Sequence, residues 1–178
     1  MGKTAKICLT DGAQDRIIVA YGIWVGSPGH RNGGYKMEFK NATMEDFDVA
    51  FDYIEKLWTY NTYDKEVIRK VYQEVIEDEN SFAFFCMEGD EYHGFCHGDY
   101  FNTFWMSGLT CYVSSIITNE DERGKGYGIK LMDHAKELAK AKGCKALTLD
   151  SGLPRKPAHR FYEIYGFEKS CYGFELIL

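Results

Sequence analysis

The sequence lacks any long hydrophobic run, because its apolar stretches stay far below the roughly 20 residues that a helix needs to span a bilayer. The N-terminus also lacks the apolar core of a signal peptide. Basic residues are fewer than acidic ones, 21 against 27, and the formal net charge of -6 gives no basic surface for nucleic acid. We therefore expect a cytoplasmic protein that binds neither membranes nor nucleic acid, and a small cationic partner suits its charge better.

Closely spaced cysteine pairs are missing as well. The six cysteines show no CxxC spacing, and most of them lie inside apolar runs: Cys8, Cys86, Cys96, Cys111, Cys144 and Cys171. We expect free, buried thiols rather than a disulfide framework. His93 and His97 would share one face of a strand, but four residues at about 3.3 Å each separate them by about 13 Å, too far for one ion. We therefore predict no metal site.

The chain does contain enough apolar material for one core, since 45% of its 178 residues are hydrophobic and 16% are aromatic. Residues 1–34 differ from the rest, with one strand-like run at 16–25 and then a glycine-rich loop, and we interpret them as an N-terminal extension. Residues 32–37 can be encoded with GGAGGA a short distance before an ATG, the layout of a bacterial ribosome-binding site. We hypothesise that Met37 is the natural start and that residues 35–178 form the functional domain.

From residue 35 onward the apolar pattern alternates between strand and helix periods. It predicts a short strand at 36–40, helices at about 46–58 and 64–78, the first capped by Thr43 and Asp46, and an antiparallel meander of strands at 81–87, 92–100 and 109–118. A helix that stops at Gly143, a buried strand in CKALTLD, a short helix from Pro157 to Gly166 and closing strands at 167–171 and 173–178 complete the order. The predicted fold class is α/β, with a mixed, mostly antiparallel central sheet and helices on both faces.

A glycine-rich stretch, ERGKGYG at residues 122–128, directly precedes the helix that stops at Gly143. Glycines let a ligand approach the main chain, and the first turn of a helix offers unpaired N–H groups that favour a phosphate. A Walker loop would need Lys and Ser or Thr after Gly128, where Ile129 and Lys130 stand, and the glycines do not have the GxGxxG spacing of a dinucleotide site. Neither nucleotide motif matches, so a nucleotide-binding protein is only a third alternative.

Another phosphate-binding pattern does match these residues. The run 123–128, RGKGYG, fills the motif Arg/Gln-x-x-Gly-x-Gly/Ala, and AHRFYEIYGFEKS carries an FYxxxGF ending at the proper distance. With both motifs, and with its element order from Tyr35, the sequence resembles the GNAT superfamily of acyl-CoA-dependent N-acyltransferases. The resemblance implies that fold and an enzyme that moves an acetyl group from acetyl-CoA to a primary amine of a small molecule, by direct transfer in a ternary complex.

The resemblance also assigns site residues. Tyr162, four residues after Ala158, is the expected general acid that protonates the leaving thiolate, with Tyr165 as a fallback, and a main-chain N–H near Ile116 would bind the oxyanion. Arg155 stands where the family often has an asparagine that touches the cofactor. The pyrophosphate and the pantetheine arm of the cofactor would be bound by Arg123, Gly124, Lys125, Gly126, Tyr127 and Gly128, and by Ile116, Ile117 and Thr118.

The resemblance does not supply the general base, because many members of the family have a glutamate on the fourth strand, and residues 108–118 contain no Asp or Glu. His97 is our candidate catalytic base, with Asp99 or the hydroxyls of Ser114 and Ser115 as alternatives. A chain without that carboxylate also fits an alternative function, a non-catalytic acyl-CoA-binding sensor or scaffold with the same fold.

The acceptor is expected to be a small-molecule amine, and a homodimer is compatible with the sequence. A polyamine, an amino acid and an aminoglycoside remain open, as do a protein N-terminus and a lysine. Aromatic residues between the first two helices are candidates to bind it, together with nearby carboxylates: Trp58, Tyr60 and Tyr63, with Asp48, Asp52 and Glu55.

Overall fold

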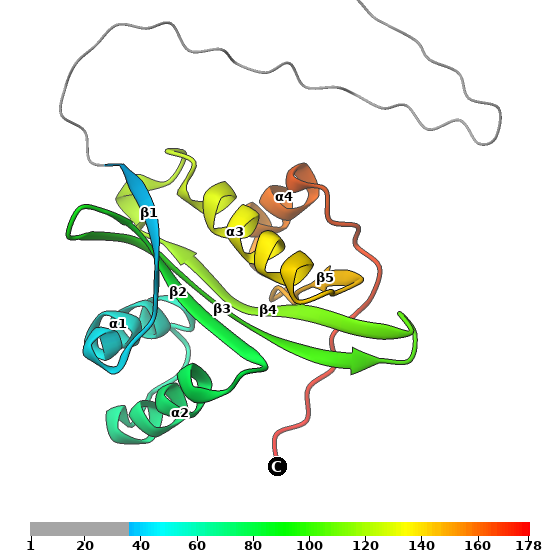
Figure 1. Cartoon of the computed structure of the whole chain (residues 1–178), viewed down its shortest axis with the longest axis horizontal. Helices are drawn as coiled ribbons and strands as arrows, with labels where there is room; N and C mark the ends of the chain where they lie inside the picture. The colour runs from blue at the N-terminus through cyan, green and yellow to red at the C-terminus, as the bar shows by residue number, and fades with distance from the viewer. Residues whose placement is uncertain (1–35) are drawn as a thin grey trace, which may run out of the picture. The chain divides into compact units, whose positions relative to one another are not determined.

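The computed structural model describes residues 36–178 of the chain, so the extension at 1–34, its predicted strand and Cys8 lie outside the described residues. Five strands form one sheet in the order β1-β2-β3-β4-β5 (Figure 1). They are β1 (Met37–Asn41), β2 (Ser81–Glu88), β3 (Glu91–Thr103), β4 (Gly108–Thr118) and β5 (Ala146–Thr148). Neighbouring strands are antiparallel except β4 and β5, which run parallel. The predicted mixed, mostly antiparallel sheet is confirmed.

Helices cover both faces of this sheet, as predicted (Figure 1). On one face, α1 (Phe47–Leu57) and α2 (Lys65–Glu77) contribute Phe47 and Tyr72 to a buried cluster with Phe85 and Phe95 of the sheet. On the other face, α3 (Tyr127–Ala141) buries an apolar stripe against β2, β3 and β4, and α4 (Lys156–Tyr165) packs aromatic side chains against the same cluster. The sheet therefore lies between two apolar layers.

Short polar residues lie at the starts of α1 and α2, and glycines follow the ends of α3 and α4. The Asp46 carboxylate accepts hydrogen bonds from the main-chain N–H and the hydroxyl of Thr43, at 3.0 and 2.8 Å, in the turn η1 (Met44–Asp46) that leads into α1. The Asp64 carboxylate accepts from the N–H groups of the first turn of α2. Gly143 and Gly166 follow α3 and α4 with φ of 85° and 114°, a conformation that glycine adopts without strain.

A β-bulge at His93 changes the face of the sheet on which this histidine lies. His93 is an extra residue on β3 with no partner on β2, and a bulge interrupts the alternation of faces along a strand. Its ring stacks on Tyr127 of α3, with centroids 4.5 Å apart. His97 instead follows the alternation of Phe95, whose ring packs on the side of α1 and α2. The prediction that the two histidines share one face is therefore wrong.

The end of the chain departs most from prediction. Residues 167–178 contain no strand, and of CKALTLD only Ala146–Thr148 is a strand. The tail exposes Phe174 at 95% and Leu176 at 83% of their surface. An alternating apolar pattern favours a strand only where a partner edge and a core face bury it, and the tail has neither here.

The cysteines and helices of the described part bear on two further expectations. Cys86, Cys96 and Cys111 are free and buried, whereas Cys144 is half-buried and Cys171 is exposed. The expectation of buried thiols therefore holds for three of these five. No helix within residues 36–178 is long and apolar enough to cross a membrane.

Candidate functional site

The site begins at an open edge of β4. Only Thr110, Cys111 and Tyr112 of this strand pair with β5, and no other strand within residues 36–178 pairs with this side of β4. The edge from 113 to 118 therefore offers main-chain groups to an extended ligand, as in strand addition. The residues predicted to lie along the pantetheine arm are on this open edge: Ile116, Ile117 and Thr118.

The two tyrosines of α4 differ in what their hydroxyls contact. The hydroxyl of Tyr165 donates a 2.8 Å hydrogen bond to Asp133 of α3, whereas that of Tyr162 has no hydrogen-bond partner within residues 36–178. The Tyr162 ring packs edge-on against Phe161 and Phe167. Burial raises the pKa of Tyr162, and the nearby Arg155 opposes this only in part. The Tyr162 phenol therefore stays protonated at neutral pH and has a free O–H to donate.

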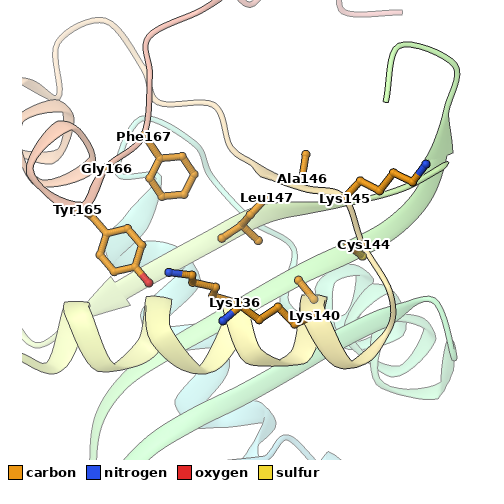
Figure 2. A pocket seen from close by; sticks show the side chains of 10 residues that line it. Lys136, Lys140, Cys144, Lys145, Ala146, Leu147, Tyr165, Gly166 and Phe167 are labelled. Atoms are coloured by element: carbon orange, nitrogen blue, oxygen red, sulfur yellow. The ribbon is translucent and has the colours of Figure 1, made fainter. Parts of the chain in front are cut away.

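A pocket of about 300 Å³ lies beside β5, between the C-terminal halves of α3 and α4. Figure 2 shows Lys136, Lys140 and Lys145 along it, with Leu147 and Phe167 as apolar walls. Among the predicted site residues only the fallback, Tyr165, lines this pocket. Tyr165 therefore belongs to a hollow apart from the glycine loop, and its hydroxyl is already bonded to Asp133.

The predicted pyrophosphate loop connects the turn η2 (Glu120–Glu122) to α3. Gly124 and Gly126 have φ of 87° and 94°, and α3 begins directly afterwards at Tyr127. A Cβ placed on either glycine would meet nothing within 4 Å. Glycine is therefore required here by the backbone conformation, and the space above the loop is left to a ligand.

The main-chain donors of this loop divide into two groups. The N–H groups of Arg123 and Lys125 already donate to the carbonyls of Glu120 and Glu122, at 3.3 and 3.2 Å. Four others have no hydrogen-bond partner within the described part of the chain, and they belong to Gly124, Gly126, Tyr127 and Gly128. Together with the positive end of the α3 dipole, these four donors suit a phosphate group. We predicted that the main-chain N–H groups of all six residues bind the pyrophosphate, but only these four are available to do so.

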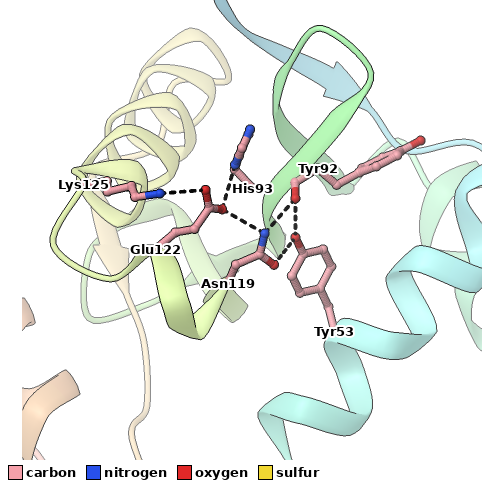
Figure 3. A network of polar contacts seen from close by, with 6 residues as sticks. All are labelled: Tyr53, Tyr92, His93, Asn119, Glu122 and Lys125. Carbon is pink, nitrogen blue, oxygen red and sulfur yellow. Dashed lines mark hydrogen bonds and ion pairs between the residues drawn. The ribbon is translucent and has the colours of Figure 1, made fainter.

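The Glu122 carboxylate, which sequence reasoning did not single out, is the polar centre beneath the loop (Figure 3). It accepts from Nδ1 of His93 at 2.7 Å, from Nδ2 of Asn119 at 2.9 Å and from Nζ of Lys125 at 3.2 Å. Burial alone would raise the pKa of Glu122, but these donors outweigh it and lower the pKa to about 2. Its position directly before Arg123 is the one sequence feature that points to it.

The candidate base lies in a row of polar side chains across β3 and β4. Ser114 is an extra residue on β4, opposite the step between His97 and Gly98, and its Oγ lies 2.7 Å from Nδ1 of His97. Nε2 of His97 is buried and lies 3.5 Å from Asp99 Oδ1. His97 lowers the pKa of Asp99 more than burial raises it. Three of the four predicted candidates thus form one cluster, while Ser115 pairs with His97 only through the main chain.

Arg155 does not extend toward the glycine loop. Its guanidinium donates a hydrogen bond to the main-chain oxygen of Leu57, the last residue of α1. It is close enough to Tyr162 to lower the pKa of that phenol. Arg155 therefore connects the start of α4, near the candidate acid, to the segment between α1 and α2.

That segment lines a second pocket, of about 350 Å³. Its walls are Trp58, Tyr60, Asn61 and Tyr63 together with Glu175 and Ile177 of the C-terminal tail. The three predicted aromatic residues are thus brought together. None of the three predicted carboxylates, those of Asp48, Asp52 and Glu55, lines this pocket, and the carboxylate that does is Glu175. The Asp48 carboxylate pairs instead with Lys65 and Arg69 at 2.9 and 3.8 Å. Within residues 36–178 no group of three or more His, Cys, Asp or Glu residues could hold a metal ion.

Comparison with known proteins agrees with this geometry. Residues 41–167 match the acetyltransferase (GNAT) family. An uncharacterised N-acetyltransferase of Bacillus subtilis (strain 168) is 41% identical over 64 residues, 35% of this chain and 45% of the relative. An uncharacterised N-acetyltransferase of Methanocaldococcus jannaschii is 27% identical over 141 residues, 73% of this chain and 60% of the relative. The matches thus span about half of each relative's own length.

Solved structures share the fold. An aminoglycoside N-acetyltransferase in complex with CoA superposes with a TM-score of 0.74 at 14% identity, covering 84% of this chain and 98% of that one. A transcriptional regulator from Bacillus halodurans C-125 superposes with a TM-score of 0.73 at 24% identity, covering 80% of this chain and 100% of that one. The sequence match extends over most of the chain, and the sheet, its open edge and the glycine loop agree with it. The chain belongs to the acetyltransferase (GNAT) family.

Proposed function

We propose that residues 35–178 form an acetyl-CoA-dependent N-acetyltransferase that transfers the acetyl group directly to a primary amine of a small molecule in a ternary complex. The observation that carries this proposal is the combination of an open β4 edge with a glycine loop whose four N–H donors have no partner in residues 36–178. A strand-like arm with a pyrophosphate at one end fits both features. Coenzyme A has that shape.

The residues of this chain fit the chemistry of acetyl transfer. The amine nitrogen bonds to the thioester carbon, and the C–S bond then breaks. A main-chain N–H at the open edge near Ile116 would bind the oxyanion. The departing thiolate would take the proton of Tyr162, whose O–H has no other partner in the described residues. The coenzyme supplies the activated acetyl group.

An amine must lose a proton to attack, and His97 is the proposed acceptor of that proton. Its Nδ1 contacts the Ser114 hydroxyl at 2.7 Å, and Asp99 lies near its Nε2. The carboxylate would stabilise the imidazolium that forms, and the half-exposed hydroxyl would pass the proton inward from the amine. This cluster would replace the glutamate that many family members have on the fourth strand.

The pocket at the end of α1 is the proposed acceptor site. Aromatic faces and a carboxylate attract a cation, and Trp58, Tyr60 and Tyr63 line this pocket together with Glu175. Arg155 joins this segment to α4, which carries the candidate acid. One structural neighbour was solved with a bisubstrate analogue that joins CoA to an acetylated neamine, so a polycationic amine is the first class to test.

A non-catalytic acyl-CoA sensor is the second candidate, because β4 contains no Asp or Glu. A free-thiol assay with acetyl-CoA and a panel of small amines separates the two functions. For the enzyme we expect coenzyme A release that depends on the amine, with one acetylated amine formed for each free thiol. Tight coenzyme A binding without release on any amine would instead support the sensor.

A further inference from the structure

The glycine loop is connected to α1 on the opposite face of the sheet by an unbroken series of hydrogen bonds. The hydroxyl of Tyr53, in α1, donates to Oδ1 of Asn119 at 2.9 Å. Nδ2 of Asn119 donates to the Glu122 carboxylate at 2.9 Å and to the main-chain oxygen of Tyr92 at 2.9 Å. Figure 3 shows Asn119 between the tyrosine ring and the carboxylate. The series therefore runs from α1, past the end of β4, to the residue directly before the loop.

His93 attaches the same carboxylate to the start of α3. Its Nδ1 lies 2.7 Å from Oε2 of Glu122, and its ring stacks on Tyr127, the first residue of α3, with planes 7° apart. Only 6% of the His93 surface is exposed. The bulge on β3 is what turns this ring toward α3.

Glu122 in turn determines the position of Lys125, which lies between the two glycines of positive φ. The carbonyl of Glu122 accepts from the main-chain N–H of Lys125 at 3.2 Å, and its carboxylate contacts the Lys125 ammonium at 3.2 Å. Both ends of the lysine are thus held by one residue. Any movement of Glu122 would therefore move Lys125, and with it the N–H groups of Gly124 and Gly126 on either side of this lysine.

The two ends of the series, Tyr53 and His93, are buried, whereas Asn119 and Glu122 between them are half-buried. Tyr53 is 4% exposed, and burial raises its pKa, so its hydroxyl remains a donor. In such surroundings paired polar groups rigidify the backbone that carries them, and a lost partner leaves a buried group unsatisfied, as Nε2 of His93 already is within residues 36–178. Ordinary surface ion pairs, such as that of Arg123 with Glu120, do not rigidify the backbone in this way.

We propose that Tyr53, Asn119, Glu122 and His93 are positioning residues that hold the glycine loop in its ligand-binding conformation, so that the affinity for coenzyme A depends on a hydroxyl of α1. This inference rests on the proposed function, since it assumes that the loop binds the pyrophosphate. None of the four is among the residues to which we assign the chemical step, Tyr162 and His97. The loss of the four positioning residues therefore weakens cofactor binding and leaves the chemical step at saturating acetyl-CoA unchanged.

Two neutral substitutions test this without altering the charge near the phosphate. Tyr53→Phe removes one hydroxyl, and Asn119→Ala removes the amide that joins the two halves of the series. The matched control is Tyr72→Phe in α2, because Tyr72 is also 4% exposed and its hydroxyl donates to the main-chain oxygen of Thr43 at 3.0 Å. All three variants are titrated with coenzyme A by calorimetry, melted, and assayed for kcat and for the KM of acetyl-CoA.

The expected result is a Kd for coenzyme A raised about tenfold in Asn119→Ala and at least about threefold in Tyr53→Phe, with kcat retained. Tyr72→Phe should lower the melting temperature as much as Tyr53→Phe and leave this Kd unchanged. Equal Kd values in Tyr53→Phe and Tyr72→Phe would overturn the inference and leave the proposed function standing. No coenzyme A binding by the unaltered chain would overturn both.

Discussion

The hydroxyl of Tyr165 donates a 2.8 Å hydrogen bond to Asp133, which occupies it on the outer side of α3. Tyr162, three residues earlier on α4, has a free hydroxyl within the described residues. We expect Tyr162→Phe to lower kcat about 100-fold, because the thiolate would leave without a proton donor, and to leave the Kd for coenzyme A unchanged. Steady-state rates and calorimetric titration measure the two quantities.

Tyr165→Phe is the matched control for this substitution, since it removes a hydroxyl from the same helix. We expect less than about a twofold change in its kcat. Wild-type turnover in Tyr162→Phe, or an equal loss in both variants, would reject Tyr162 as the acid.

The backbone of the glycine loop gives a second prediction. Gly126→Ala forces a residue with a Cβ to φ of 94°, which costs about 1 kcal/mol or relaxes the loop. Gly143→Ala is its control, because Gly143 has φ of 85°, an equally open surrounding and a place at the far end of α3. Both variants should lose stability to chemical denaturant, but only Gly126→Ala should bind coenzyme A more weakly. A similar loss of affinity in Gly143→Ala would show that the loop is not the binding element.

The contact between His97 and Ser114 gives a third prediction. His97→Gln should lower kcat about 100-fold for an amine that is protonated at the assay pH, because its proton has no acceptor. The loss should shrink for an acceptor of low pKa that is already neutral. His134→Gln serves as control, since His134 stacks on Phe39 away from the site. Equal losses for protonated and neutral amines would assign His97 a structural role.

The Glu122 carboxylate gives a prediction on acid stability. Because its pKa is lowered from 4.5 to about 2 in the folded protein, it contributes stability that is complete above about pH 4.5 and is lost as the pH falls toward 2. Glu122→Gln should therefore be less stable than wild type at pH 7, and the difference should close by pH 2 to 3. Urea unfolding across this range measures it. A difference that stays constant with pH would contradict the lowered pKa.

Local patterns explain why so much of the fold was predictable. The helical spacing of Phe47, Phe51 and Ile54 specifies α1, and the positive-φ glycines at 126, 143 and 166 stand where helices begin or end. The C-terminal strands were predicted wrongly for the opposite reason. Residues 173–178 alternate in a strand-like way, but strand formation depends on a distant partner edge, which the sequence does not specify.

The site likewise combines features that depend on local sequence with features that depend on distant residues. The glycine loop is contiguous in sequence and could be identified from it. The contact between His93 and Glu122 joins residues 29 apart, and that between Tyr53 and Asn119 joins residues 66 apart. The first depends on the bulge at His93 and the second on the crossing of α1 over the sheet, and periodicity reveals neither.

Acetyl transfer itself is tested most directly by incubating the unaltered chain with acetyl-CoA and a panel of small amines, and measuring free thiol and acetylated amine in the same samples. We predict equal amounts of the two products with at least one polycationic amine, and their loss together in Tyr162→Phe. Coenzyme A binding without either product, over the whole panel, would contradict it.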